Sequence, residues 1–189
     1  MNIIRLRTDL KIGCHSISEQ NHDLLLNSCL SDPYQHLYDY ALVGAIENQV
    51  ALHNYELIYE IFGDLIKIYL QKIEENTDNY NIKKIWFNSM KKTEYNPLHT
   101  HDGDYSFVYI FNFDEELEKE RNFKKSTIKA NCAGQLSFVY SKENRIKEFA
   151  EQNLNSKFYI FPSNLAHIVY PFYSDVTRYS LSGNICLYS

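Results

Sequence analysis

The sequence of 189 residues predicts an α+β fold, with a mainly helical part (residues 1–78) packed on a β core (residues 79–189). Its composition favours β structure, because the 16 Tyr and 11 Phe suit pleated, half-buried surfaces. Near Asn79 the pattern also changes from helical periodicity to short apolar runs. Many short strands separated by turns are typical of a sandwich or barrel. At this length we expect a single domain.

Three helices are predicted in the first part. Ser16-Ile17-Ser18-Glu19 is a capping sequence for a helix that runs towards Cys29, and residues 38–50 are a second candidate. The clearest helix begins at His53 or Asn54 and ends near Glu75. Its apolar residues fall on one face at helical spacing, which we interpret as a packing face. They are Ile58, Ile61, Phe62, Leu65, Ile68, Tyr69 and Ile73.

Six strands are predicted in the second part, at residues 82–90, 105–113, 135–140, 157–161, 166–170 and 177–187. The segment 105–113 (YSFVYIFNF) is almost continuously apolar, as expected of a strand buried on both faces. Two charge-rich segments, 115–121 and 142–152, are expected at the surface, the second as a short helix.

Charge and composition argue against several classes of protein. The formal charge is −5 and no Lys/Arg-rich face is evident, so non-specific binding to nucleic acid is not expected. No run of 18 apolar residues exists to span a membrane. Arg5, Arg7 and Asp9 interrupt the first apolar stretch, which leaves no signal-peptide core. The four cysteines lack CxxC spacing, so we expect reduced thiols in a cytoplasmic protein.

Three histidines of the β part form a candidate metal site. His99 and His101 precede the most apolar strand, and residues two apart in an extended segment point to the same face. The other histidine of the β part is His167, on or beside a late strand. Imidazole ligands suit Fe(II), Zn, Ni or Cu, and a facial site with open positions suits non-haem Fe(II). The sequence therefore predicts a mononuclear metal site within a small barrel.

Arg178 and Ser180 form a candidate anion site. They follow His167 by eleven and thirteen residues and share a face if 177–187 is a strand. An arginine beside a hydroxyl can bind a carboxylate in bidentate fashion, within reach of the metal. The alternative is that Arg178 simply pairs with a surface acid such as Asp175.

These residues carry a family resemblance. The segments WFNSMKKTEYNPLHTHDGDYSFVYIF, GQLSFVY and FYIFPSNLAHIVYPFYSDVTRYSLSGNI resemble the 2-oxoglutarate- and Fe(II)-dependent oxygenases, in particular a small, often phage-encoded group related to prolyl hydroxylases. The resemblance implies a double-stranded β-helix (jelly-roll) with N-terminal helices, and Fe(II) held by the histidines. It also implies that Arg178 and Ser180 hold the far carboxylate of 2-oxoglutarate, to which Tyr109 donates its hydroxyl. O₂ would then hydroxylate an unidentified small-molecule or peptidyl substrate, with a residue such as proline as the first candidate.

The metal motif departs from the usual HxD or HxE of that family. The residue two after His99 is His101, and the residue two after His101 is Gly103. The ligands could be His99, His101 and His167, which is the simplest same-face arrangement. They could instead be His101 and His167 with Asp104, or two histidines and water. A further alternative is a cupin-like barrel that binds a metal or ligand without 2-oxoglutarate, although such a barrel needs no dicarboxylate clamp.

Overall fold

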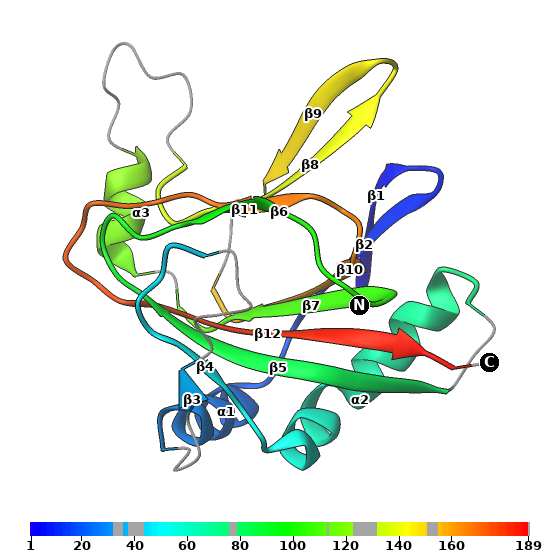
Figure 1. The fold of residues 1–189 in the computed structure, drawn as a ribbon, viewed down its shortest axis with the longest axis horizontal. Helices are drawn as coiled ribbons and strands as arrows, with labels where there is room; N and C mark the ends of the chain where they lie inside the picture. The colour runs from blue at the N-terminus through cyan, green and yellow to red at the C-terminus, as the bar shows by residue number, and fades with distance from the viewer. Residues whose placement is uncertain are drawn as a thin grey trace.

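The architecture is built on two antiparallel β-sheets. The computed structural model describes residues 1–31, 44–75, 79–112, 114–122, 132–150 and 155–188, together with the backbone of 36–37. Among these residues, the larger sheet has eight strands in the order β1-β2-β10-β7-β12-β5-β4-β3, and the smaller has four in the order β6-β11-β8-β9. The smaller sheet lies over one face of the larger, and α1 and α2 lie on the other (Figure 1). This is the double-stranded β-helix that the family resemblance implied.

The elements have the following bounds. The strands of the larger sheet are β1 (Asn2–Arg7), β2 (Leu10–Ser16), β3 (His36–Leu37), β4 (Gln49–Ala51), β5 (Tyr80–Met90), β7 (Tyr105–Ile110), β10 (Lys157–Pro162) and β12 (Arg178–Leu187). The strands of the smaller sheet are β6 (Asn96–His99), β8 (Leu136–Lys142), β9 (Arg145–Ala150) and β11 (His167–Val169). The helices are α1 (Glu19–Ser31), α2 (Tyr55–Lys72) and α3 (Glu115–Asn122). None of these helices is long and apolar enough to cross a membrane.

The buried strand β7 separates two hydrophobic cores. All six of its residues are buried, because β10 and β12 pair with it on either side and both faces are covered. Phe107 and Tyr109 face the helices, where they pack against Phe62 of α2. Val108 and Ile110 face the smaller sheet. Successive side chains of a strand alternate between faces, so this division decides which residues can reach a site between the sheets.

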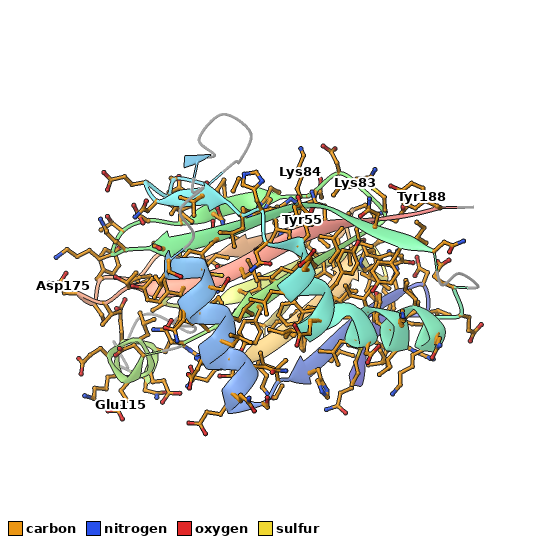
Figure 2. All side chains as sticks on the ribbon, turned by 90° about the horizontal axis from the view of Figure 1, so that it is seen from below. Tyr55, Lys83, Lys84, Glu115, Asp175 and Tyr188 are labelled. Carbon is orange, nitrogen blue, oxygen red and sulfur yellow. The ribbon has the colours of Figure 1, made fainter. Side chains whose placement is uncertain are left out.

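The two long helices confirm their predictions. Asn54 caps α2, since its side chain accepts a hydrogen bond from the backbone N–H of Leu57, and the apolar stripe of the helix is buried. Ser18 caps α1 by accepting from the backbone N–H of Asn21. In Figure 2 both helices are seen in front of the strands, which they cover.

Three parts of the predicted secondary structure are wrong. Residues 1–16 form the β1–β2 hairpin at one edge of the larger sheet, so the first part is not mainly helical. Of the predicted helix at 38–50, residues 38–43 lie outside the described residues, and the rest contains a bridge at Ala45 and β4. Within the predicted helix at 142–152, residues 145–150 form β9 instead, because Glu143 and Asn144 both adopt positive φ angles and turn the chain into a hairpin with β8. Residues 151–152 lie outside the described residues.

Replacing Gly183 on β12 with alanine is expected to destabilise the protein. A Cβ at this position would lie 2.5 Å from two ring carbons of Phe107 and 2.8 Å from the carbonyl oxygen of Lys84. Overpacking of this kind costs about 1–3 kcal/mol, measurable by urea denaturation. Gly63→Ala, within α2, is the matched control, since the nearest atom to its Cβ would be the hydroxyl oxygen of Tyr80 on β5, at 3.4 Å. Helix propensity predicts that this control gains about 0.5–1 kcal/mol. Equal stability of the two variants would contradict the packing argument.

Candidate metal and co-substrate site

A cavity of about 250 Å³ lies between the two sheets. Its walls come from β4, β5, β7, β10 and β12 of the larger sheet and from β6, β8 and β11 of the smaller one. The cavity is polar along β12, where alternate residues face it: Arg178, Ser180, Ser182 and Asn184. The histidines and the arginine selected from the sequence therefore line one cavity.

Strand pairing brings the three histidines together. His167 on β11 is the direct cross-strand partner of His99 on β6, and His101 follows two residues later. The Nε2 atoms of His101 and His167 are 3.2 Å apart, and one ligand nitrogen from each of the three lies within 4.8 Å of the others. Two nitrogens that each lie about 2.1 Å from a metal, at right angles to one another, are about 3.0 Å apart. The His101–His167 separation therefore fits two adjacent positions around one ion, and His99 lies near enough to supply a third ligand.

Neighbouring groups orient these rings towards a common point. The Nδ1 of His99 is hydrogen-bonded to the carbonyl oxygen of Pro97 at 2.6 Å, and that of His167 to the carbonyl oxygen of Leu165 at 3.0 Å. Such bonds fix the tautomer and leave Nε2 as the ligand atom. His101 instead packs against Trp86, with 5.3 Å between ring centroids. Its backbone N–H donates to the carbonyl oxygen of Ser163 on the adjacent loop at 2.9 Å.

The histidines are neutral at neutral pH, as metal ligands must be. Burial lowers the pKa of His99, and it lowers the pKa of His101 to about 4. Burial, reinforced by the other two imidazoles, lowers the pKa of His167 to about 3. Each ring therefore offers a lone pair rather than a proton. The donor set of three neutral imidazoles suits Fe(II).

Among the residues that the structure describes, no carboxylate belongs to this cluster. Asp104 instead accepts a hydrogen bond from the backbone N–H of Leu187 at 2.7 Å, and it does not belong to the potential ligand group found among the described residues. Gly103, two residues after His101, has a φ of 97°, and a Cβ there would lie 2.9 Å from the carbonyl oxygen of Ile185. An acidic residue at this position would be strained and would clash, which is a physical reason for the departure from HxD.

Arg178 is a buried cation in the wall of the cavity. It is 2% exposed, and its Nε and Nη2 groups donate no hydrogen bond to any described residue. Asp175 pairs with Lys92 at 3.0 Å rather than with Arg178, so that alternative is wrong. Burial lowers the pKa of Arg178 to about 10, which still leaves it charged at neutral pH. Because an unpaired buried charge costs several kcal/mol, an anionic ligand is expected here.

Ser180 lies beside Arg178, as the two-residue spacing predicts. Its Oγ accepts a hydrogen bond from Arg178 Nη1 at 3.3 Å, and another from Asn88 Nδ2 at 3.3 Å. Asn88 lies directly opposite Ser180 on the paired strand β5. The group combines a guanidinium, a hydroxyl and an amide, which suits a carboxylate.

Tyr109 does not reach this site, which corrects the role expected for it. Its hydroxyl is 2.8 Å from Nδ1 of His22 on α1, and its ring packs against Phe62 and Phe111 in the core beneath the helices. The reason is the alternation of β7, which points Tyr109 to the face opposite Val108 and the cavity.

Other residues near the motifs divide between site and scaffold. Trp86, Asn88 and Asn96 line the cavity, whereas Tyr95 is 41% exposed and is not among its lining residues. Ser182 and Asn184 could have been found by continuing the alternation of Arg178 and Ser180. Gln49 could not, because it lies in a segment with a helix-like pattern.

The fold and the site define a class of protein: a double-stranded β-helix with a histidine cluster and a buried carboxylate receptor in one cavity. Residues 84–184, just over half of the chain, match the family model described as "Putative 2OG-Fe(II) oxygenase". The chain belongs to this family of 2-oxoglutarate- and Fe(II)-dependent oxygenases. Its cofactors are therefore Fe(II) and 2-oxoglutarate, and its enzyme class is that of the dioxygenases.

Solved structures share the fold at low sequence identity. A prolyl-4-hydroxylase from Pseudomonas putida is 12% identical with a TM-score of 0.62, and the match covers 94% of this chain and 93% of that one. A viral collagen prolyl hydroxylase from Paramecium bursaria Chlorella virus-1 is 11% identical with a TM-score of 0.58, over 92% and 94% of the chains. A prolyl hydroxylase from Trichoplax adhaerens is 13% identical with a TM-score of 0.57, over 94% and 83%. No curated protein matches the chain.

Proposed function

We propose that His99, His101 and His167 hold Fe(II), and that Arg178 and Ser180 bind the far carboxylate of 2-oxoglutarate. The observation that carries this proposal is the unpaired guanidinium of Arg178, buried in the same cavity as three neutral, converging imidazoles. When bound, Fe(II) supplies the site at which O₂ is activated. The balanced reaction converts substrate C–H, 2-oxoglutarate and O₂ into substrate C–OH, succinate and CO₂.

The protein's own residues orient the reactants and limit access of water. The three imidazoles would hold the ion from one side and would leave positions open for 2-oxoglutarate and O₂. The fixed guanidinium can bind a carboxylate at two donors, which holds the co-substrate in one orientation. Phe161 packs against His167 with 4.9 Å between ring centroids, and Trp86 packs against His101. These rings exclude water from one side of the cluster.

We propose a peptidyl substrate, with proline as the first candidate residue. Support comes from the named structural neighbours, two of which are a viral collagen prolyl hydroxylase and a prolyl hydroxylase in complex with a peptide fragment of hypoxia inducible factor. We also propose that residues 1–189 form a single oxygenase domain and that the protein is cytoplasmic. The structural matches, which extend over most of the chain, support the single domain.

The proposal predicts two results. Anaerobic addition of 2-oxoglutarate to the Fe(II)-loaded protein should produce the weak visible charge-transfer band of the chelate. On admission of O₂, proline-containing peptides should increase succinate release and gain the mass of one oxygen atom, whereas the same peptides with alanine in place of proline should not. Metal binding without the band would favour a cupin-like binding protein. A band with product formed only from non-peptidyl metabolites would contradict the peptidyl substrate.

A further inference from the structure

Asn88 is a buried polar residue in the middle of a sheet. It is 2% exposed and lies on β5, where it is the cross-strand partner of Ser180 on β12 and of Gln49 on β4. All three side chains line the cavity. A buried amide at the centre of a strand is costly unless its hydrogen bonds are made. The presence of an amide at this position of the cavity wall therefore needs an explanation.

The hydrogen bonds of Asn88 are only half satisfied within the protein. Its Nδ2 donates to Ser180 Oγ at 3.3 Å, but its Oδ1 has no partner among the described residues. An unpaired buried acceptor costs free energy, so the Oδ1 atom does not explain why an amide lies here. The Nδ2 group does form a hydrogen bond, and its acceptor is Ser180, beside Arg178.

Ser180 shows what that donor achieves. A serine hydroxyl has two acceptor positions and one proton to donate. Arg178 Nη1 and Asn88 Nδ2 occupy both acceptor positions, each at 3.3 Å. The hydroxyl proton is therefore left to point towards a third group, and a carboxylate bound by Arg178 would supply that acceptor. Without Asn88, the hydroxyl would be free to rotate and to present a lone pair instead.

We propose that Asn88 is a positioning residue for the co-substrate: by donating to Ser180 Oγ, it directs the Ser180 hydroxyl proton to the carboxylate that Arg178 binds. The inference rests on the proposed function, and it adds a residue that makes its contribution through Ser180. The proposal requires a hydrogen-bond donor at position 88. An aspartate there would have the same shape but could only accept, so it would turn the Ser180 hydroxyl proton towards itself and would compete with the co-substrate for Arg178.

Two substitutions at Asn88 test the proposal through the affinity for 2-oxoglutarate. The dissociation constant is measured by titrating anaerobic Fe(II)-loaded protein and following the charge-transfer band. Asn88→Ala removes the donor and should weaken binding by about tenfold, the value of one hydrogen bond to a charged group. Asn88→Asp keeps the shape but adds an anion beside Arg178, so it should weaken binding by at least about 100-fold. Fe(II) affinity should stay within about twofold of wild type in both variants.

A double-mutant cycle separates a positioning role from a structural one. If Asn88 acts through Ser180, then Asn88→Ala combined with Ser180→Ala should bind 2-oxoglutarate no more weakly than Ser180→Ala alone. The control is Ser89→Ala, whose side chain lies on the opposite face of β5 and whose affinity should equal that of wild type. Additive effects, or unchanged binding in Asn88→Asp, would overturn the inference while leaving the proposed function intact. Absence of the band in the wild-type protein would overturn the proposed function itself.

Discussion

Replacement of His167 with alanine is expected to lower the affinity for Fe(II) by more than about 100-fold, because changes to groups behind a metal ligand already cost about 10–100-fold. His167 is 5% exposed and is the cross-strand partner of His99, so strand pairing fixes its position in the cluster. The chain contains a single tryptophan, and its ring lies 5.3 Å from that of His101. Anaerobic titration can therefore follow quenching of Trp86 fluorescence by the bound ion.

Two comparisons make the His167 result specific. His53→Ala removes an exposed imidazole that lies outside the cavity, so its Fe(II) affinity should equal that of wild type. Circular dichroism of the metal-free variants establishes that the fold is retained. If His167→Ala bound Fe(II) as tightly as His53→Ala, the three-histidine site would be refuted.

Replacement of Arg178 with methionine is expected to raise the dissociation constant of 2-oxoglutarate by at least about 30-fold, since removing one partner of a buried charge pair costs about 2–5 kcal/mol. Fe(II) binding should be retained, because Arg178 lies outside the histidine cluster. Arg178→Lys should fall between the two proteins, as an ammonium group lacks the planar fork of donors. The charge-transfer titration measures all three affinities. Equal loss of Fe(II) binding would show that Arg178 has a structural role instead.

In the absence of metal and 2-oxoglutarate, the Arg178→Met variant should be more stable than the wild-type protein. Arg178 is buried with unpaired donors, and replacing a buried charge with an apolar side chain is often stabilising by about 1–4 kcal/mol. Thermal unfolding of the metal-free proteins should therefore give a higher Tm for Arg178→Met than for wild type. In the Fe(II)-loaded proteins, added 2-oxoglutarate should raise the Tm of wild type more than that of Arg178→Met. Tyr109→Phe is the control, and its 2-oxoglutarate affinity should be unchanged because its hydroxyl contacts His22 on the far face. A weakened affinity in that control would restore the role first expected for Tyr109.

The accuracy of the predicted strands depended on burial. Strands β5, β7, β10 and β12, each of which pairs with a neighbour on both sides, were predicted to within a few residues. Their apolar residues are buried and form runs or alternate, which gives a strand signal even where polar residues face the cavity. The edge strand β9 was mistaken for a helix, since exposed charges such as Arg145, Lys147 and Glu148 hide a period of two. The hairpin at residues 1–16 was missed, although Ile4 and Leu6 alternate with Arg5 and Arg7. That alternation was a usable signal.

The sequence by itself determined the fold class, the three histidines and the pairing of Arg178 with Ser180. Composition and pattern indicated the β core, and the family resemblance implied the double-stranded β-helix. The pairs His99/His101 and Arg178/Ser180 could be predicted because residues two apart on a strand share a face whatever the rest of the molecule does. Only the tertiary structure decided which face meets the cavity: the segment 105–113 is apolar on both sides, so nothing local tells Tyr109 from Val108. The exclusion of Asp104 and the contact between Asn88 and Ser180 likewise depend on strands far apart in the chain. Cross-strand register sets these contacts, and long-range pairing sets the register.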